Sequence, residues 1–245
     1  MTFKEFKEQL FANSIHDCYK ILETNKDQNF YSKCVDILDK ENERLTKLSK
    51  YENFLKNTGN TYIAGTDEAG RGPLAGPIVA GAVILDDNEL LFGINDSKKL
   101  TAEKRDKLFD KILNNCIAAS IHTITNKQID EINIANADII AMKMSIEKLS
   151  IVPDHVLTDA FFVEGLQMNQ TPLKHGDALS ISIAAASIIA KVTRDRMMDE
   201  YDKIYPHYGF SNNKGYGTKE HINAIKKYGI CPIHRKTFVK NFIQI

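Results

Sequence analysis

The stretch Gly65-Thr-Asp-Glu-Ala-Gly-Arg-Gly-Pro-Leu-Ala-Gly-Pro77 connects two apolar segments, 62–66 and 78–85, that have the composition of β-strands. Two adjacent carboxylates, Asp67 and Glu68, come directly after the first segment, and a glycine-rich loop follows them. Acidic residues are depleted in strands, so this pair lowers stability unless something compensates for its charge. The stretch therefore predicts a strand, a loop and a second strand, with a candidate functional site between them.

Beyond this stretch, predicted strands alternate with predicted helices. Apolar segments indicate strands at 116–124 and 155–158, and apolar periodicity indicates helices over 101–113, 133–149, 178–201 and 219–228. The helix over 178–201 is apolar on most sides in its first half, so we expect it to be buried against the sheet. This alternation is typical of an α/β fold in which one mixed β-sheet is flanked by helices.

Residues 1–58 differ from the rest of the chain because they contain no predicted strand. Apolar residues recur there at helical spacing, and ten Lys/Arg balance ten Asp/Glu up to Lys56. The polar turn Asn57-Thr-Gly-Asn60 ends the segment. We therefore expect a helical N-terminal appendage over 1–58 and a main domain over 59–245. The appendage either packs on the main domain or contacts a partner.

Composition narrows the class of protein. Hydrophobic residues make up 43% of the chain and charged residues 26%, which is ordinary for a globular protein. The longest apolar run, 181–192, is interrupted by Ser182, Ser187 and Lys191, and this favours a buried helix over a membrane span. The N-terminus lacks the features of a secretory signal, and the four cysteines form no Cys-x-x-Cys pair. We expect a cytoplasmic monomer without membrane contact.

Charge is unevenly distributed although the formal net charge is zero. Between Lys203 and Lys240 there are eight Lys/Arg against one acid, Glu220, and aromatic residues are interleaved with them. Such a stretch suits a surface that follows a nucleic-acid backbone and stacks on bases. A solvated basic face explains the same pattern equally well.

Two further acids lie where a metal site would need them. Asp159 ends the strand predicted at 155–158, a position where α/β sheets gather functional groups, and Asp177 precedes the long helix. Together with Asp67 and Glu68 they could hold two Mg²⁺ or Mn²⁺ ions about 3.5–4 Å apart, the arrangement used for in-line attack on a phosphodiester. Without metal, four converging carboxylates would repel one another strongly.

Each feature also has an ordinary explanation. An Asp-Glu pair is most often surface charge, and Gly-Arg-Gly is most often a turn. Asp177 suits the N-cap of the helix that follows it. A cap and a metal ligand are compatible, because a carboxylate has two oxygens.

Eight motifs in one order resemble type 2 ribonuclease H, the bacterial ribonuclease HII family. They are GTDEAGRGPLAGPIVAGAVIL, NDSKKL, IDEIN, KHGD, SIAAASIIAKVTRD, YPHYGF, KGYGT and HRKTF. The resemblance covers roughly residues 62–240 and implies a ribonuclease H-like fold. It also implies that Asp67, Glu68, Asp159 and Asp177 are the catalytic, metal-binding carboxylates.

The resemblance assigns substrate contacts as well. Gly70, Arg71 and Gly72 match a motif that contacts the 2′-hydroxyl of the ribonucleotide at an RNA–DNA junction. Tyr216 matches a tyrosine that stacks on the sugar of the following deoxynucleotide, and Lys98 matches a phosphate contact. Lys191 and Arg194 also match the family, without an assigned role.

The implied activity is that of an endonuclease with two divalent ions. It hydrolyses the RNA strand of RNA/DNA hybrids and nicks 5′ of ribonucleotides embedded in duplex DNA, leaving 3′-hydroxyl and 5′-phosphate ends. Ribonucleotide excision repair and primer removal in DNA replication would be its roles. Residues 238–243 could contact a replication clamp, and a terminal element that packs on the domain is the simpler explanation.

Three alternatives stay open. A type 3 ribonuclease H would need a run of ribonucleotides, and another two-metal nuclease or transposase would not require a 2′-hydroxyl. A non-catalytic hybrid-binding module would turn nothing over. An aspartate as the fourth carboxylate and the intact Gly70-Arg71-Gly72 favour type 2.

Overall fold

A five-stranded mixed sheet forms the centre of the protein in the computed structural model, which describes residues 2–26, 29–86 and 91–240. The order β3-β2-β1-β4-β5 brings together β1 (Ile63–Ala69), β2 (Ile78–Leu85), β3 (Cys116–Ile124), β4 (His155–Asp159) and β5 (Asn169–Leu173). β1 pairs antiparallel with β2 and parallel with β4. The predicted mixed α/β fold is confirmed, and β5 is a strand that the sequence pattern did not predict.

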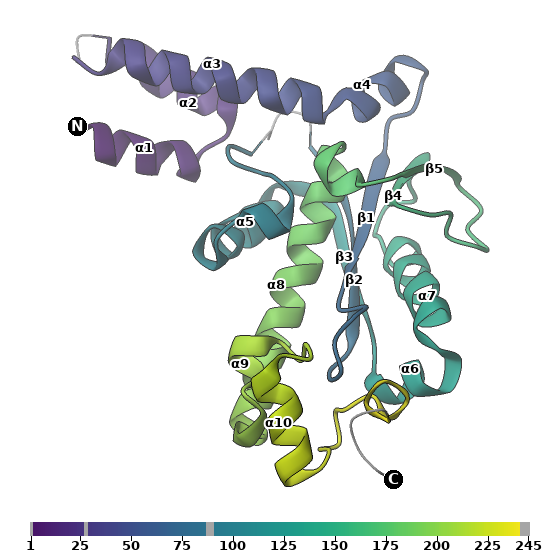
Figure 1. Cartoon of the computed structure of the whole chain (residues 1–245). Helices are drawn as coiled ribbons and strands as arrows, with labels where there is room; N and C mark the ends of the chain where they lie inside the picture. Colours follow the sequence, from purple (N-terminus) through teal and green to yellow (C-terminus); the bar gives the residue numbers. More distant parts are fainter. Residues whose placement is uncertain (1, 27–28, 87–90, 241–245) are drawn as a thin grey trace.

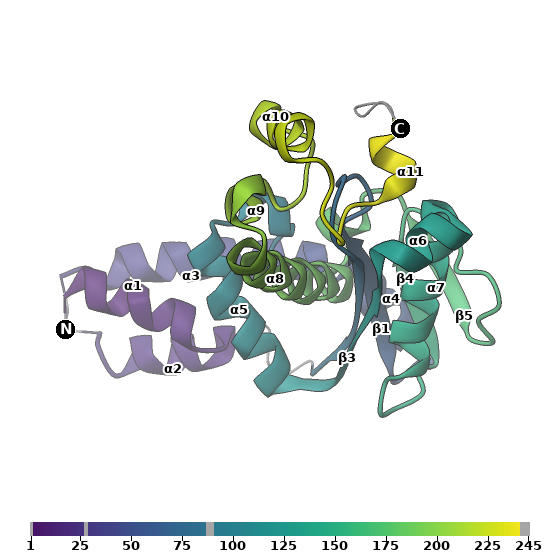
Figure 2. The same cartoon turned by 90° about the horizontal axis from the view of Figure 1, so that it is seen from below.

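Helices cover both faces of this sheet. Figure 2 shows α5 (Ala102–Asn115) and α8 (Ile181–Ile204) on one side, with α6 (Asn126–Ile132) and α7 (Ile134–Glu147) on the other. Residues 181–190 of α8 are all buried, as its apolar first half predicts. Gly65 of β1 makes this packing possible, because a Cβ there would lie 2.1 Å from the backbone carbon of Ser182. In the described part of the chain, no helix is long and apolar enough to cross a membrane.

The start of α8 differs from the prediction. A short 3₁₀ turn, η3 (Gly176–Ala178), precedes the helix, which begins at Ile181 rather than at residue 178. Ser180 is the N-cap, and its side chain accepts a hydrogen bond from the Ile183 amide at 3.2 Å. The alternative explanation of Asp177 as the cap of this helix is therefore wrong, because Asp177 lies in η3, the turn that precedes the helix.

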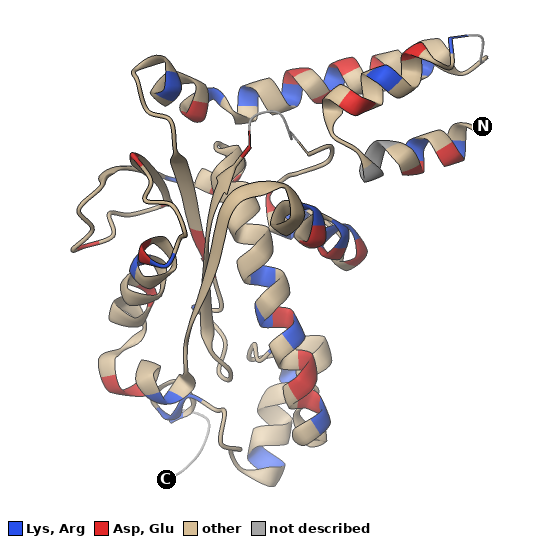
Figure 3. Ribbon diagram, turned by 180° about the vertical axis from the view of Figure 1, so that it is seen from behind, with Lys and Arg blue, Asp and Glu red and all other residues tan. Residues whose placement is uncertain are grey.

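Four helices occupy the N-terminal segment: α1 (Phe3–Ala12), α2 (Ile15–Glu23), α3 (Tyr31–Leu48) and α4 (Lys50–Asn57). α3 buries Cys34, Leu38 and Leu45, a helical spacing, and these residues share one apolar cluster with residues of α5 and α8. Lys/Arg and Asp/Glu are interleaved along α3 (Figure 3). The helices thus lie against the α8 side of the sheet (Figure 1). The domain boundary near residue 58 stays a prediction.

The C-terminal part folds into short helices: η4 (Pro206–Tyr208), α9 (Phe210–Asn213), α10 (Lys219–Tyr228) and α11 (Lys236–Val239). Tyr208 and Phe210 are buried in one apolar cluster, so they serve the core rather than a stacking surface. Arg235 is buried too, whereas Tyr216 is exposed. Within residues 203–240, the apolar cluster thus forms a core, and most of the basic side chains are exposed to solvent around it. Residues 241–243 of the expected clamp-binding tail lie outside the described residues.

Candidate active site

Three of the four predicted acids meet at one edge of the sheet. Thr66 of β1 pairs with Thr158 of the parallel strand β4, so the next residues along each strand, Asp67 and Asp159, emerge side by side. Both line a cavity of about 280 Å³ together with Glu68. Parallel register alone explains why residues far apart in sequence meet here.

The predicted substrate residues surround the same cavity. Its lining includes all five of them, Gly70, Arg71, Gly72, Lys98 and Tyr216, and also Lys191 and Arg194, for which no role was predicted. Asp177 is not part of the lining, but Lys98 Nζ lies 3.2 Å from its Oδ2. Asp159 Oδ1 accepts a hydrogen bond of 2.6 Å from the Gly176 amide, so the turn that carries Asp177 is tied to the cavity wall.

Negative charge in this cavity is poorly compensated. Burial, and then the charges of Glu68 and Asp159, raise the pKa of Asp67 well above its usual range. Burial, and then the charge of Asp138, raise the pKa of Glu68 to about 7. Burial also raises the pKa of Asp159. Clustered carboxylates of this kind gain stability from a bound divalent cation, for which their oxygens are suitable ligands.

The acids are near one another without being assembled into a ligand set. Within residues 2–26, 29–86 and 91–240, no group of three or more acidic, histidine or cysteine side chains is arranged to hold a metal ion. Asp177 contacts Lys98 instead, and Asp159 contacts the Gly176 amide. Cation binding would therefore require these side chains to rearrange.

The buried side chain of Arg194 holds the glycine-rich loop after β1. The Arg194 guanidinium donates to the carbonyls of Pro77 at 2.9 Å and Ala75 at 3.2 Å. Gly70, at φ +103°, passes so close that a Cβ there would lie 2.1 Å from Arg194 Nε. Glycine is required at this position by both its backbone angle and the arginine beneath it. Arg194, for which the sequence provided no role, thus anchors the loop.

Comparison with known proteins identifies the family. A model of the family "Ribonuclease HII" matches residues 64–241. The chain belongs to the ribonuclease HII family. Ribonuclease HII of Ruminiclostridium cellulolyticum is 46% identical over 252 residues, which cover 100% of this chain and 99% of that protein. The chain is therefore a ribonuclease H-type hydrolase with the ribonuclease H-like fold.

Solved structures agree with this assignment. Ribonuclease H2 of Pyrococcus horikoshii matches with a TM-score of 0.64 and 28% identity, covering 74% of this chain and 97% of that one. A PCNA:RNase HII complex from Archaeoglobus fulgidus matches with a TM-score of 0.59 and 25% identity, covering 71% and 94%.

Sequence reasoning missed Arg235 as part of this ribonuclease HII site. Arg235 is fully buried and donates to three carbonyls of the loop: Gly76 at 3.0 Å, Arg71 at 2.9 Å and Gly70 at 2.6 Å. The motif His-Arg-Lys-Thr-Phe that contains it contributed to the resemblance, but an arginine near the C-terminus has no spacing that links it to residues 70–76. Arg235 thus fixes the carbonyls of Gly70 and Arg71, and Arg194 holds the carbonyls of Ala75 and Pro77 further along the same loop.

Asp138 of α7 is the second residue that was missed. It is fully buried, its Oδ2 lies 3.0 Å from Arg71 Nε, and burial raises its pKa to about 7. An aspartate within the apolar sequence Ala137-Asp138-Ile139 is a signal that could have found it, since charged residues are rarely buried without a partner.

Two buried histidines, His221 and His234, hold the backbone of Tyr216. The Cys231 amide donates to His234 Nδ1 at 2.9 Å, so the proton of His234 is on Nε2, which lies 3.0 Å from His221 Nε2. His221 must accept that proton's hydrogen bond, and it therefore donates through Nδ1 to the Tyr216 carbonyl at 2.9 Å. This series of hydrogen bonds fixes the tautomers of His221 and His234 and the backbone of Tyr216.

Proposed function

We propose that this ribonuclease H hydrolyses the RNA strand of RNA/DNA hybrids and nicks duplex DNA on the 5′ side of embedded ribonucleotides. The observation that carries the proposal is the mutually repelling carboxylate group of the buried Asp67 and the half-buried Glu68 and Asp159, beside a Gly-Arg-Gly loop that Arg235 holds. A cavity with this charge suits a phosphodiester only when cations are present, because bare carboxylates repel phosphate.

The four acids would hold two divalent cations, Mg²⁺ or Mn²⁺. When bound, such ions supply an activated water nucleophile and neutralise charge on the departing 3′ oxygen. Asp67 and Glu68 on β1 are fixed by the sheet, whereas Asp177 would turn away from Lys98 to complete the set. Lys98 would then be available for a substrate phosphate.

Selectivity would depend on one hydroxyl group of the substrate. Backbone groups of Gly70-Arg71-Gly72, of which Arg235 holds the Gly70 and Arg71 carbonyls, are suited to a fixed hydrogen bond with a ribose 2′-hydroxyl. Tyr216 lines the same cavity next to Gly72, and 45% of its surface is exposed, so its ring is free to stack on the next sugar. Product ends would be 3′-hydroxyl and 5′-phosphate.

A DNA duplex with one embedded ribonucleotide tests the proposal. With Mg²⁺ or Mn²⁺ we expect a nick on its 5′ side, and Asp67→Asn should reduce the rate at least 1,000-fold while leaving the fold intact by circular dichroism. An all-DNA duplex of the same sequence is the control. Cutting of the all-DNA duplex at an equal rate would contradict the hydroxyl requirement, and activity restricted to long RNA runs would favour a type 3 enzyme.

Further proposals concern assembly. We infer a monomer whose residues 1–58 form an appendage, and a replication clamp contact through the C-terminal residues 238–243. The clamp proposal is supported by the similarity to RNase HII of Archaeoglobus fulgidus, whose solved structure is a complex with PCNA. Deleting residues 241–245 should abolish co-elution with a clamp and leave hybrid cleavage unchanged.

A further inference from the structure

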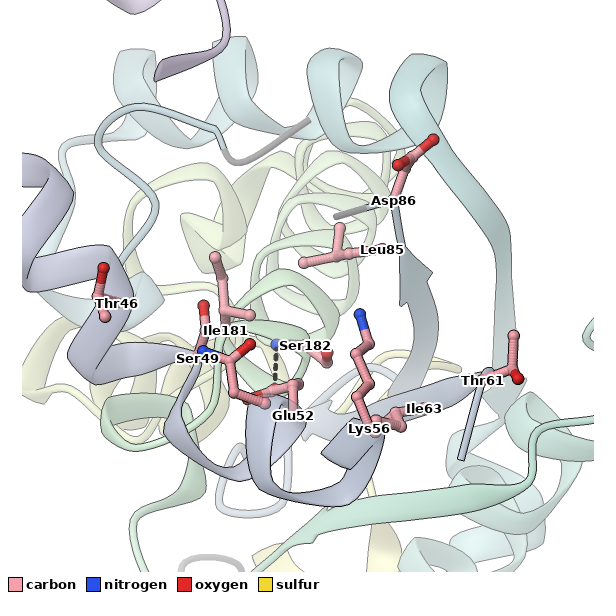
Figure 4. Close-up of a pocket in the computed structure, with 11 residues that line it drawn as sticks. Thr46, Ser49, Glu52, Lys56, Thr61, Ile63, Leu85, Asp86, Ile181 and Ser182 are labelled. Atoms are coloured by element: carbon pink, nitrogen blue, oxygen red, sulfur yellow. Dashed lines mark hydrogen bonds between the residues drawn. The ribbon is translucent and has the colours of Figure 1, made fainter. Parts of the chain in front are cut away.

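Glu52 of α4 reaches from the N-terminal helices to the start of α8. Its carboxylate is 5% exposed and lies beside a cavity of about 210 Å³ between the two helices (Figure 4). One oxygen, Oε1, accepts two hydrogen bonds, from Ser180 Oγ at 2.5 Å and from the Ser182 amide at 3.0 Å. A residue outside the family-matched segment 64–241 thus binds the first turn of the central helix.

These contacts complete the capping of α8. Ser180 Oγ accepts from the Ile183 amide, so its own proton is directed toward Glu52. The Ser182 amide is one of the first amides of the helix, which have no partner within the helix. A carboxylate at this end also interacts favourably with the helix dipole. Removing it would leave a buried donor without an acceptor.

The same first turn is joined to the candidate metal ligand Asp177. The Ser180 amide donates to the Gly176 carbonyl at 2.8 Å, which closes the turn that contains Asp177. At its other end the Gly176 amide donates to Asp159 Oδ1. The turn is therefore held by Asp159 on the cavity side and, through Ser180, by Glu52 on the far side.

β1 restricts the same segment from another direction. Gly65 lies against the Ser182 backbone so closely that no side chain fits between them, and Asp67 is two residues further along β1. The Ser182 backbone is thus enclosed between β1 and Glu52. Loss of the Glu52 carboxylate would open one wall of this enclosure and leave the other in place.

We propose that Glu52 is a positioning residue, which fixes the turn of Asp177 relative to Asp67 and Asp159 by bracing the N-terminus of α8. The proposal rests on the proposed metal-binding role of Asp177. It assigns the N-terminal helices a part in the arrangement of the active site. The contact through Oε1 alone is the important one, since Oε2 has no hydrogen-bond partner among the described residues.

Glu52→Ala, Glu52→Gln and the matched control Glu41→Ala test this role. Glu41 of α3 also ties the N-terminal helices to the main domain, by accepting from the Gly93 amide at 2.7 Å, but it does not touch α8. Glutamine retains an oxygen for both donors. The readouts are Mn²⁺ affinity by calorimetry, amide exchange of residues 176–185, and kcat on a hybrid.

We expect Glu52→Ala to weaken Mn²⁺ binding about 10-fold, as loss of a residue that orients a metal ligand commonly does. Amides of residues 180–183 should exchange faster. Glu52→Gln should stay within about twofold of wild type in both measurements, and Glu41→Ala should lower thermal stability without changing either. If Glu52→Ala fails to fold, Glu52→Asp, whose shorter side chain cannot reach both donors, replaces it with the same expected result.

Two outcomes separate the possible failures. Equal Mn²⁺ affinity in Glu52→Ala and Glu41→Ala, with Asp177→Asn inactive, would overturn the positioning role and leave the proposed function intact. Full metal binding and cleavage by Asp177→Asn would overturn the metal-site assignment on which the inference rests.

Discussion

Arg71 Nε lies 3.0 Å from Asp138 Oδ2, and this contact joins the loop after β1, which lines the active-site cavity, to α7. The side chain of Arg71 is half exposed, whereas that of Asp138 is 1% exposed. The pair is an ion pair without hydrogen-bond geometry, since neither Asp138 oxygen has a hydrogen-bond partner among the described residues. The contact holds the Arg71 guanidinium against α7, while half of the Arg71 side chain stays exposed.

The first prediction concerns Asp138→Asn in metal-free protein. Burial, opposed by Arg71 and increased by Asp67 and Asp159, raises the pKa of Asp138 from 3.8 to about 7. A raised carboxyl pKa means that the folded state binds this proton more tightly, so its contribution to stability is lost as pH rises from 3.8 to 7. Relative to wild type, the variant should therefore gain about 2 kcal/mol of unfolding free energy between pH 5 and pH 8.

Urea unfolding at the two pH values, with chelator present, measures this gain. The neighbouring carboxylates titrate together with Asp138, so the comparison between variant and wild type matters more than either curve alone. A difference that does not change with pH would show that Asp138 carries no raised pKa.

The second prediction concerns Arg235→Lys. A lysine cannot present the fork of donors that binds the carbonyls of Gly76, Arg71 and Gly70, and it would leave them buried and unpaired. We expect a loss of about 2–4 kcal/mol of unfolding free energy and at least a 10-fold lower kcat/KM on hybrid. Arg196→Lys is the control, because Arg196 makes an exposed ion pair with Asp106. Equal effects in the two variants would argue against loop anchoring.

Strand and helix patterns predicted the fold because each pattern is local. The apolar run 78–85 and the buried half of α8 follow from composition and periodicity. β5 was missed because Asn169–Leu173 is short and contains a proline. The start of α8 was placed too early because the choice between Asp177 and Ser180 as cap depends on backbone geometry that composition does not encode.

The candidate site was predictable where chemistry follows directly from residue type. Asp159 ends β4 as predicted. Asp67 and Glu68 were expected just after the first strand but lie in the last three residues of β1, and acids are rare in strands. Arg235 and Glu52 act through backbone carbonyls and amides of segments 130 to 165 residues away, and such partners are set by tertiary packing alone. A resemblance indicates that a motif matters, but the contact that makes it matter is visible only in three dimensions.

The third prediction concerns Tyr216, which should distinguish junction recognition from general binding. Tyr216→Ala should lower kcat/KM on DNA with a single ribonucleotide about 10-fold, with a smaller effect on RNA/DNA hybrid, because it removes a stacking surface next to the cleavage site. Tyr216→Phe should retain most activity. Tyr228→Ala is the matched control, since Tyr228 is 47% exposed and Tyr216 is 45% exposed. Uniform loss on both substrates would count against junction sensing.

The fourth prediction concerns His234→Gln and the acid side of the stability curve. Burial, and then the charge of His221, lower the pKa of His234 from 6.5 to about 4. The unfolded state therefore binds this proton first, so the contribution of His234 to stability is complete above pH 6.5 and is lost as pH falls toward 4. Wild type should lose about 2–3 kcal/mol more unfolding free energy than the variant between pH 6.5 and pH 4.5, because the variant lacks this titration. Chemical denaturation in chelator at these two pH values measures the difference, and parallel curves for the two proteins would mean that His234 is not held neutral by the chain of contacts from Cys231 to Tyr216.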